Sequence, residues 1–344
     1  MSDLRSSDLK RQARGLRAPL FAAALALMVA PPAGAGVPEA LNEHILPGLA
    51  GFSESAEALA VTAGADCTAE TVRPAYQAAF DAWTVIGDIR IGPSETGVLS
   101  VAFWPDTRGF TAKGLREMIA AEAPEGRDPA AFAEASIAVR GLFALERLLY
   151  DDAFSGYAQG SYTCDLVQTV AQEMAQHASG LSAAWQDNFA EVLTSAGEPG
   201  NATYMTRDEA VRALYTQVLT SLEMTADNRL GRPLGTFDRP RPARAEAWRA
   251  GRSLRNVLLE TDAAVDLARG LADWDLPQTE AALTTLHEIA GRVTDPTFQR
   301  VDDPMERLRV EIVQQQVRAV RDAIELEIGV RLGMSPGFNS ADGD

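Results

Sequence analysis

The chain has 344 residues, of which 46% are hydrophobic, and this is enough for a substantial core in one large or two medium domains. Its formal net charge of −17 argues against nucleic acid as a partner, because the phosphates would be repelled. Aromatic residues make up only 7% of the chain, and alanine is abundant, which favours helices.

The first 35 residues have the pattern of a cleaved export signal. A basic region is followed by an apolar run at residues 18–30, which is too short to cross a bilayer. Ala33, Gly34 and Ala35 then supply the small residues that signal cleavage needs. We therefore expect cleavage after Ala35 and a periplasmic mature protein. No later run is long and apolar enough to predict a membrane span in the mature chain.

Apolar residues spaced three and four apart predict helices along most of the remaining chain. These helices cover residues 38–64, 68–87, 111–121, 128–150, 165–195, 206–228, 243–266, 277–293 and 304–332. The stretches at residues 88–109 and 229–242 contain turn-forming glycine and proline and are predicted to be irregular. Because no run alternates with the period of two that strands show, we predict an all-α fold.

A glycine and proline cluster at residues 197–200 predicts the main domain boundary. It separates a bundle of residues 36–196 from a bundle of residues 204–335, and a tail of residues 336–344 follows. Both halves place a glycine-, proline- and arginine-containing loop between long helices, which indicates a weak internal repeat. Two related helical bundles packed side by side would bury the apolar faces of these helices, including Leu308 and Ile312 on the last one.

Cys67 and Cys164 are the only two cysteines, and each lies near the start of a predicted helix. Export would place both in an oxidising compartment, so we expect a disulfide between them. Two free, buried thiols remain the alternative. No histidine or further cysteine lies at ligand spacing from either one, which disfavours a metal site.

The helix predicted over residues 128–150 carries one acid in an apolar setting. Asp128 can cap its start, and Pro129 suits its first position. Leucines at positions 142, 145, 148 and 149 cover more than half of its circumference, and Glu146 lies at the edge of this surface. A carboxylate there needs a cationic or hydrogen-bonding partner, or it retains a proton.

Residues 141–150 resemble the signature helix of the imelysin-like proteins of bacteria, which carry the pattern Gly-x-His-x-x-Glu. Gly141 and Glu146 match this pattern, but Phe143 stands where the family has histidine. Further similar blocks cover residues 79–83, 90–93, 102–106, 229–235, 247–256 and 337–344. The resemblance implies an all-helical fold of two related bundles, a site where the bundles meet, export, and an association with iron uptake.

The founding members of that family were described as peptidases, and the family is classed with the metallopeptidases. Metal-dependent hydrolysis needs about three protein ligands around an open position. The histidines of this chain are His44, His177 and His287, and none of them begins a His-Glu-x-x-His pattern. Because Phe143 cannot bind a metal either, we expect a non-enzymatic binding role. A metallopeptidase and a module that binds an envelope transport protein are the alternatives.

The predicted site is a cleft between the two bundles, formed by basic, aromatic and acidic side chains. Its candidate residues are Arg90, Trp104, Asp106, Arg140, Phe143, Glu146, Arg229 and Arg232. Glu146 is the candidate metal ligand in an oxygen-rich site for a hard cation such as ferric iron. Its candidate helpers are Asp106, Glu95, His44 and Asp88. Alternatively, the arginines pair with these acids and only hold the bundles together.

Residues 229–255 are rich in arginine, although the chain as a whole is acidic. This local positive band suits an anionic ligand, such as a carboxylate-bearing iron chelate or the propionates of haem. The alternative is mutual neutralisation with the acidic remainder. We therefore expect iron or an iron chelate as the cofactor or ligand.

Overall fold

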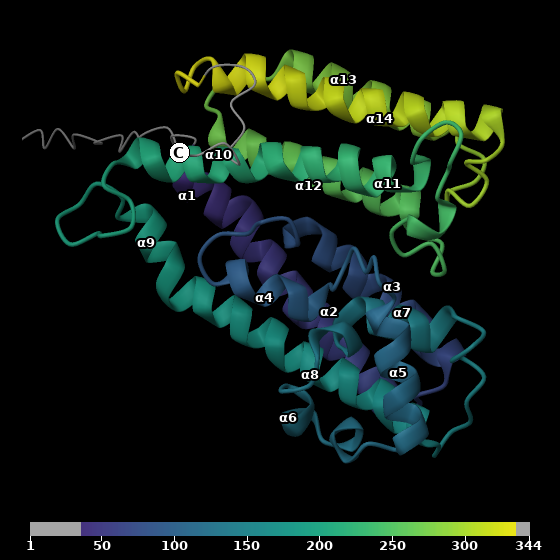
Figure 1. Ribbon diagram of the computed structural model, residues 1–344. Coiled ribbons are helices and arrows are strands. Elements are labelled where there is room, and N and C mark those ends of the chain that lie inside the picture. The colour runs from purple at the N-terminus through teal and green to yellow at the C-terminus, as the bar shows by residue number, and fades with distance from the viewer. Residues whose placement is uncertain (1–35, 335–344) are drawn as a thin grey trace, which may run out of the picture. The chain divides into compact units, whose positions relative to one another are not determined.

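Helices make up the regular structure of residues 36–334, which the computed structural model describes (Figure 1). Within this range the only extended pairing is an isolated bridge between Thr236 and Arg239. No helix in the described range has the length and apolarity that crossing a membrane requires. The all-α class predicted from the sequence is confirmed. The predicted signal segment of residues 1–35 and the predicted tail of residues 336–344 lie outside the described residues.

The first group of helices is built around α2, which packs against α3 and α8. Its helices are α1 (Val37–Glu39), α2 (Leu46–Ala65), α3 (Ala69–Ile86), α4 (Ser94–Val101), α5 (Phe110–Ala121), α6 (Pro129–Phe132), α7 (Gly141–Tyr150), α8 (Tyr162–Ala184) and α9 (Ala190–Thr194). A π-helical segment, Ala40–Ile45, joins α1 to α2 just before Pro47, which has no N–H to continue the normal bonding pattern.

The second group of helices contains two packed pairs, α10 with α12 and α13 with α14 (Figure 1). Its helices are α10 (Arg207–Glu223), α11 (Gly231–Leu234), α12 (Ser253–Leu271), α13 (Pro277–Ala290) and α14 (Pro304–Ile324), and the π-helical segment Met224–Leu230 links α10 to α11. Thr206 caps α10 as its sequence predicts, because its hydroxyl accepts the Glu209 N–H at 3.2 Å. Helix α12 also packs against α3 and Ala40–Ile45, so the apolar core runs from one group into the other.

The prediction of a single helix over residues 128–150 is wrong. Asp128 does cap a helix, but that helix, α6, ends at Phe132, and α7 begins only at Gly141. Gly141 has a φ of +67°, and a Cβ at this position would lie 2.1 Å from the carbonyl oxygen of Val101. Glycine is therefore required here both by the backbone conformation and by the close approach of the chain after α4.

Three further expectations are corrected. The helix predicted to begin at residue 243 begins at Ser253, because Ala247 and Gly251 have positive φ values that a helix cannot contain. The stretch predicted to be irregular after residue 87 contains α4. The apolar stripe predicted for the last helix is only partly buried, since Leu308 and Ile312 are 46% and 42% exposed.

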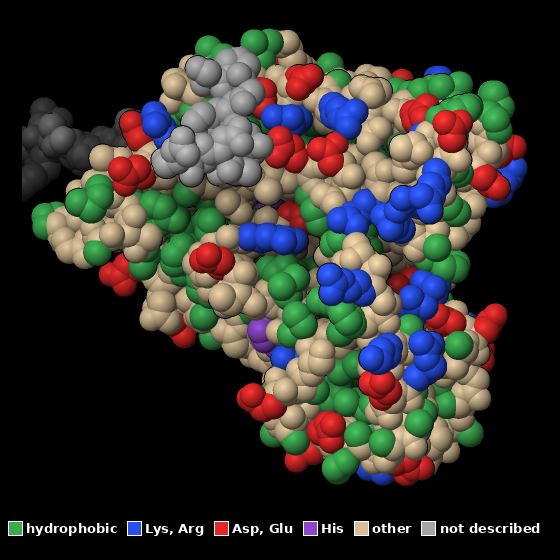
Figure 2. All heavy atoms as spheres, viewed as in Figure 1, with side chains coloured by type: hydrophobic (Ala, Val, Ile, Leu, Met, Phe, Trp, Pro, Cys, Tyr) green, Lys and Arg blue, Asp and Glu red, His purple; other side chains and the backbone are tan. Residues whose placement is uncertain are grey.

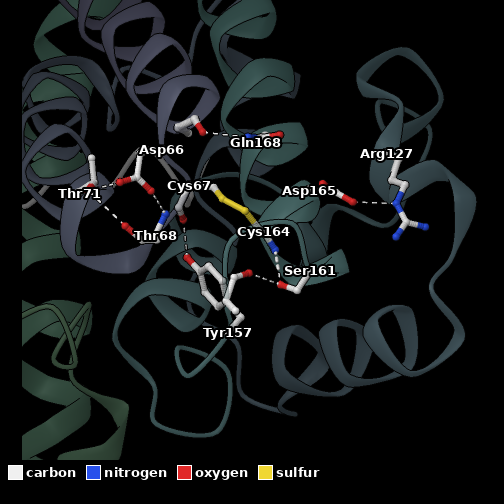
Figure 3. The surroundings of a disulfide bond; sticks show 12 residues. Asp66, Cys67, Thr68, Thr71, Arg127, Tyr157, Ser161, Cys164, Asp165 and Gln168 are labelled. Carbon is white, nitrogen blue, oxygen red and sulfur yellow. Dashed lines mark hydrogen bonds and ion pairs between the residues drawn. A yellow bond between two sulfur atoms is a disulfide. The ribbon is translucent and has the colours of Figure 1, made fainter.

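Cys67 and Cys164 form a disulfide, as predicted, and it ties the chain before α3 to the first turn of α8 (Figure 3). The bridge lies beside Tyr157, whose hydroxyl donates to the Cys67 carbonyl at 2.9 Å. The two cysteines are 97 residues apart in sequence. In the loop-entropy account, a closure of this length stabilises the folded state by on the order of 4 kcal/mol.

We predict that Gly141→Ala lowers the free energy of unfolding by about 2–5 kcal/mol, because it adds both backbone strain and a steric clash. Gly51→Ala is the matched control, since a Cβ at that α2 position meets nothing within 4 Å. We expect it to be neutral or to stabilise by up to about 1 kcal/mol through helix propensity. Urea unfolding followed by circular dichroism measures both variants, and equal effects would contradict the explanation.

Candidate functional site

A cavity of about 250 Å³ lies between α7, the loop that precedes α5, and the segment that leads into α12. Its lining residues come from both groups of helices. They are Phe103, Trp104, Pro105, Asp106, Thr107, Thr111, Phe143, Glu146, Arg147, Arg232, Ala243, Arg244, Ala245, Ala247, Trp248 and Arg249. Figure 2 shows Lys and Arg side chains gathered at the level where the two groups meet. The cavity thus joins an aromatic wall to a basic one.

Glu146 projects from α7 into this lining and is only 4% exposed. Its Oε1 atom accepts the backbone N–H of Arg249 at 2.9 Å and that of Ala250 at 3.4 Å. Burial raises the pKa of Glu146, and the charge of Arg249 and the two backbone donors oppose this rise only in part. The acid therefore anchors the segment before α12 to α7 and holds its proton more tightly than an exposed glutamate.

Asp106 also lines the cavity, but its carboxylate has a structural role at the start of α5. Its oxygens accept the backbone N–H groups of Arg108, Phe110 and Thr111 at 3.2, 3.0 and 2.9 Å. Partial burial acts to raise its pKa, but these donors outweigh burial and hold the pKa of Asp106 below its usual value. The carboxylate is therefore ionised and already compensated by the backbone.

The aromatic wall contains Phe143, the residue that stands in place of the family histidine. Its ring stacks on Trp104 with centroids 6.3 Å apart and an angle of 17° between the planes. On another side, Phe80 meets Phe143 edge to face at 5.6 Å. Phe143 is 7% exposed, so it fills the space between α3, α7 and the loop before α5. The replacement makes this part of the cavity apolar.

The four arginines of the lining fall into two pairs. Arg147 and Arg249 share one carboxylate of Asp151, at 2.5 and 3.0 Å. Arg232 donates to the side-chain oxygen of Asn228 at 2.7 Å, and Arg244 is exposed at the edge of the cavity. Within residues 36–334, neither Arg232 nor Arg244 takes part in an ion pair.

The pKa of Arg232 is consistent with this lack of an ion-pair partner. Burial lowers the pKa of Arg232, and the neighbouring charge of Arg244 lowers it further. Two like charges therefore lie close together at the cavity. An anion between them would relieve their repulsion and restore the usual pKa of Arg232.

Five of the residues predicted for the cleft share this lining, namely Trp104, Asp106, Phe143, Glu146 and Arg232. The structure places Arg90, Arg140 and Arg229 elsewhere. Arg90 is a surface residue 3.9 Å from Asp88, and Arg140 pairs with the buried Glu173. The expectation that these three arginines line the same cleft is therefore not met by the geometry.

Arg229 is instead the centre of a buried cluster of three acids. Its guanidinium contacts Asp88 at 2.8 Å, Glu246 at 3.0 Å and Glu260 at 3.0 Å. Burial raises the pKa of Glu260 well above its usual range, although Arg229 opposes the rise. His44 lies in the same wall as Asp88 and Glu260. Of the helpers proposed for a metal at Glu146, Asp106 lines the cavity, Asp88 belongs to this cluster with His44 beside it, and Glu95 lies on the exposed side of α4.

Sequence reasoning missed several residues of the lining. Trp248 and Arg249 lie inside the block of residues 247–256 that resembles the family, so this resemblance could have identified them as candidates. Arg244 lies in the arginine-rich stretch but has no feature that separates it from its neighbours. Thr111 has no distinguishing sequence signal, because its role depends on how α5 is placed beside α7.

The lining does not fit a protein-held metal centre. Among the described residues, no group of three His, Cys, Asp or Glu side chains is arranged so that it could hold a metal ion. The oxygens of Asp106 accept backbone donors, burial raises the pKa of Glu146, and Phe143 offers no donor atom. In the described part of the chain, the charges of the lining that neither ion pairs nor backbone N–H groups compensate are therefore positive.

Comparison with known proteins identifies the family. The sequence model of the imelysin peptidase family, described as Imelysin, matches residues 45–324, so the chain belongs to the imelysin family. None of the curated proteins compared with the chain matches it.

Two solved structures show the same fold. An imelysin-like protein from Psychrobacter arcticum aligns with a TM-score of 0.72 and 17% identity over 88% of this chain and 96% of its own. The second, from Parabacteroides distasonis, is named a "putative iron-regulated protein A precursor". It aligns with a TM-score of 0.67 and 13% identity over 84% of this chain and 93% of its own.

We predict that Glu146→Gln gains stability relative to the wild type as the pH rises. A carboxyl whose folded pKa is raised contributes stability below its ordinary value of 4.5 and loses it as the pH rises through the folded pKa. Glutamine keeps an oxygen for the Arg249 N–H but never ionises. Urea unfolding at pH 4.5 and 7.5 should therefore show the difference between variant and wild type moving in favour of the variant.

Glu280→Gln is the control for this measurement. The side-chain hydrogen bonds from Arg269 lower the pKa of Glu280, so its carboxylate stabilises the fold above the ordinary value and loses this effect as the pH falls. Its difference from the wild type should move in the opposite sense. A Glu146→Gln difference that does not change with pH would contradict the inferred burial of an ionisable acid.

Proposed function

We propose that this chain is a non-enzymatic binding protein of iron uptake that holds a small anionic iron chelate in the cavity between its two groups of helices. The observation that carries the proposal is the pair Arg232 and Arg244, two close positive charges without an ion-pair partner in the described residues. Guanidinium groups bind carboxylates through paired, charge-assisted hydrogen bonds. A carboxylate-bearing ligand would supply the negative charge that the cavity lacks.

The size of the cavity supports a small chelate rather than a macrocycle such as haem. Its volume of about 250 Å³ lies just below the range of roughly 300–1,000 Å³ that is typical of small-molecule sites. Trp104 and Phe143 provide an apolar wall against which the carbon skeleton of a ligand can pack. In this arrangement the iron is cargo, and oxygen atoms of the chelator hold it.

The association with iron rests on the family. The motif of Gly141 and Glu146 resembles that of imelysin-like proteins linked to iron uptake, and one protein of the same fold carries an iron-regulated name. Export to the periplasm, which the pattern of residues 1–35 predicts, suits a protein that meets iron chelates before transport. The structural roles of Asp106 and Glu146 favour binding over hydrolysis, because both carboxylates already hold backbone N–H groups.

We predict that ferric citrate stabilises residues 36–344 against thermal unfolding, by about 2.7 kcal/mol at a hundred times its Kd. Arg232→Gln and Arg244→Gln should each weaken binding about 10- to 100-fold, as expected for the loss of a charge-assisted hydrogen bond. Arg318→Gln is the control, because this exposed arginine of α14 pairs with Asp227 and does not line the cavity. Thermal shift and titration calorimetry measure these effects.

Two results would contradict the proposal. One is the absence of stabilisation by ferric citrate and by other ferric carboxylates. The other is a stabilisation that Arg318→Gln reduces as much as Arg232→Gln does, since it would reflect general charge rather than a site.

A further inference from the structure

The hydrogen-bond acceptors and donors that line the cavity differ in how many of them are free to bind a ligand. Most of the carboxylate oxygens already accept hydrogen bonds, because Asp106 accepts three backbone N–H groups through its two oxygens and Oε1 of Glu146 accepts two. The available charged groups, on Arg232 and Arg244, are donors only. A free or hydrated cation would therefore find little to bind, whereas an acceptor-rich anion would find partners on several sides.

Two neutral donors of the lining also have no partner in the described part of the chain. They are the hydroxyl of Thr111 and the indole N–H of Trp248, and both atoms are buried. Thr111 is 3% exposed, and its backbone N–H is already bonded to Asp106 at 2.9 Å. A buried polar group without a partner is unfavourable, and such groups in native proteins usually have a specific reason.

Both donors are held in place by their surroundings. Thr111 lies in the first turn of α5, which Asp106 caps. The guanidinium of Arg249 lies 4.1 Å from the centroid of the Trp248 ring, and the backbone of Arg249 is anchored to Glu146. The two donors thus belong to different helical groups, and a ligand oxygen reaches either one after a small side-chain adjustment, because both atoms have almost no accessible surface.

From these observations, and resting on the function proposed above, we infer that the protein recognises the chelator and not the iron. Carboxylate groups of a polycarboxylate would neutralise Arg232 and Arg244, and its remaining oxygens would accept from Thr111 and Trp248. Two carboxylates would compensate the two positive charges, so we take a di- or tricarboxylate as the ligand class. An iron-free chelator keeps all its carboxylate oxygens available, and so it should bind at least about as well as its ferric complex.

Titration calorimetry with iron-free citrate, ferric citrate and gallium citrate tests this inference. We expect the three to bind within about tenfold of one another. Thr111→Val keeps the shape of the side chain and removes the hydroxyl, and Trp248→Phe keeps an aromatic ring and removes the N–H. Each should weaken iron-free citrate about three- to tenfold, the usual effect of one neutral hydrogen bond.

Matched controls lie outside the cavity. Thr284→Val removes an exposed hydroxyl that bonds only to the Glu280 carbonyl of its own helix. Trp274→Phe removes an indole N–H that donates to the Glu327 carbonyl. Both should leave citrate affinity unchanged, and thermal unfolding without ligand confirms that all four variants are folded.

The outcomes separate this inference from the proposed function. If ferric citrate binds through Arg232 and Arg244 but iron-free citrate does not, recognition of the chelator is wrong and the proposed function stands. If both bind but neither Thr111→Val nor Trp248→Phe weakens them beyond the controls, the role of the neutral donors is wrong. If no form of citrate or another polycarboxylate binds, the proposed function fails as well.

Discussion

The arrangement of this protein depends on one buried ionic cluster, in which Arg229 contacts Asp88, Glu246 and Glu260. The four residues come from the chain after α3, the π-helical segment before α11, the loop before α12, and α12 itself. Breaking such a cluster by removing one partner typically costs 3–5 kcal/mol, because a buried charge is left uncompensated. Glu246 directly precedes Ala247 and Trp248, so the cluster fixes the segment that forms one wall of the cavity.

The cavity has the opposite charge balance from the cluster beside it. At Arg229, three acids surround one guanidinium, and burial raises the pKa of Glu260. At the cavity, Asp106 and Glu146 are occupied by backbone donors, while Arg232 and Arg244 keep their charge. Two arginines without an ion-pair partner at the same cavity make the electrostatic potential there locally positive, although the protein as a whole is acidic.

The sequence predicted the fold class, the disulfide and the family, because these depend on periodicity and on local patterns such as Gly141 and Glu146. Prediction from the sequence failed for features that depend on tertiary contacts. The helix over residues 128–150 looked continuous, but α6 ends at Phe132 and α7 begins at Gly141, where the positive φ and the close approach of Val101 require glycine. The arginines of residues 229–255 are alike in sequence, yet Arg229 is buried among acids and Arg232 lines the cavity. Which arginine is neutralised depends on acids more than a hundred residues away, such as Asp88.

We propose that an anionic chelate occupies the cavity and that Arg232 and Arg244 hold it. A crystal structure of the mature protein with ferric citrate, with anomalous data at the iron edge, tests it most directly. We expect an anomalous peak from iron inside the cavity. Citrate oxygens should coordinate this iron, and citrate carboxylates should contact the two guanidinium groups. Iron bound directly by Glu146 and Asp106 without citrate, or citrate bound outside the cavity, would contradict it.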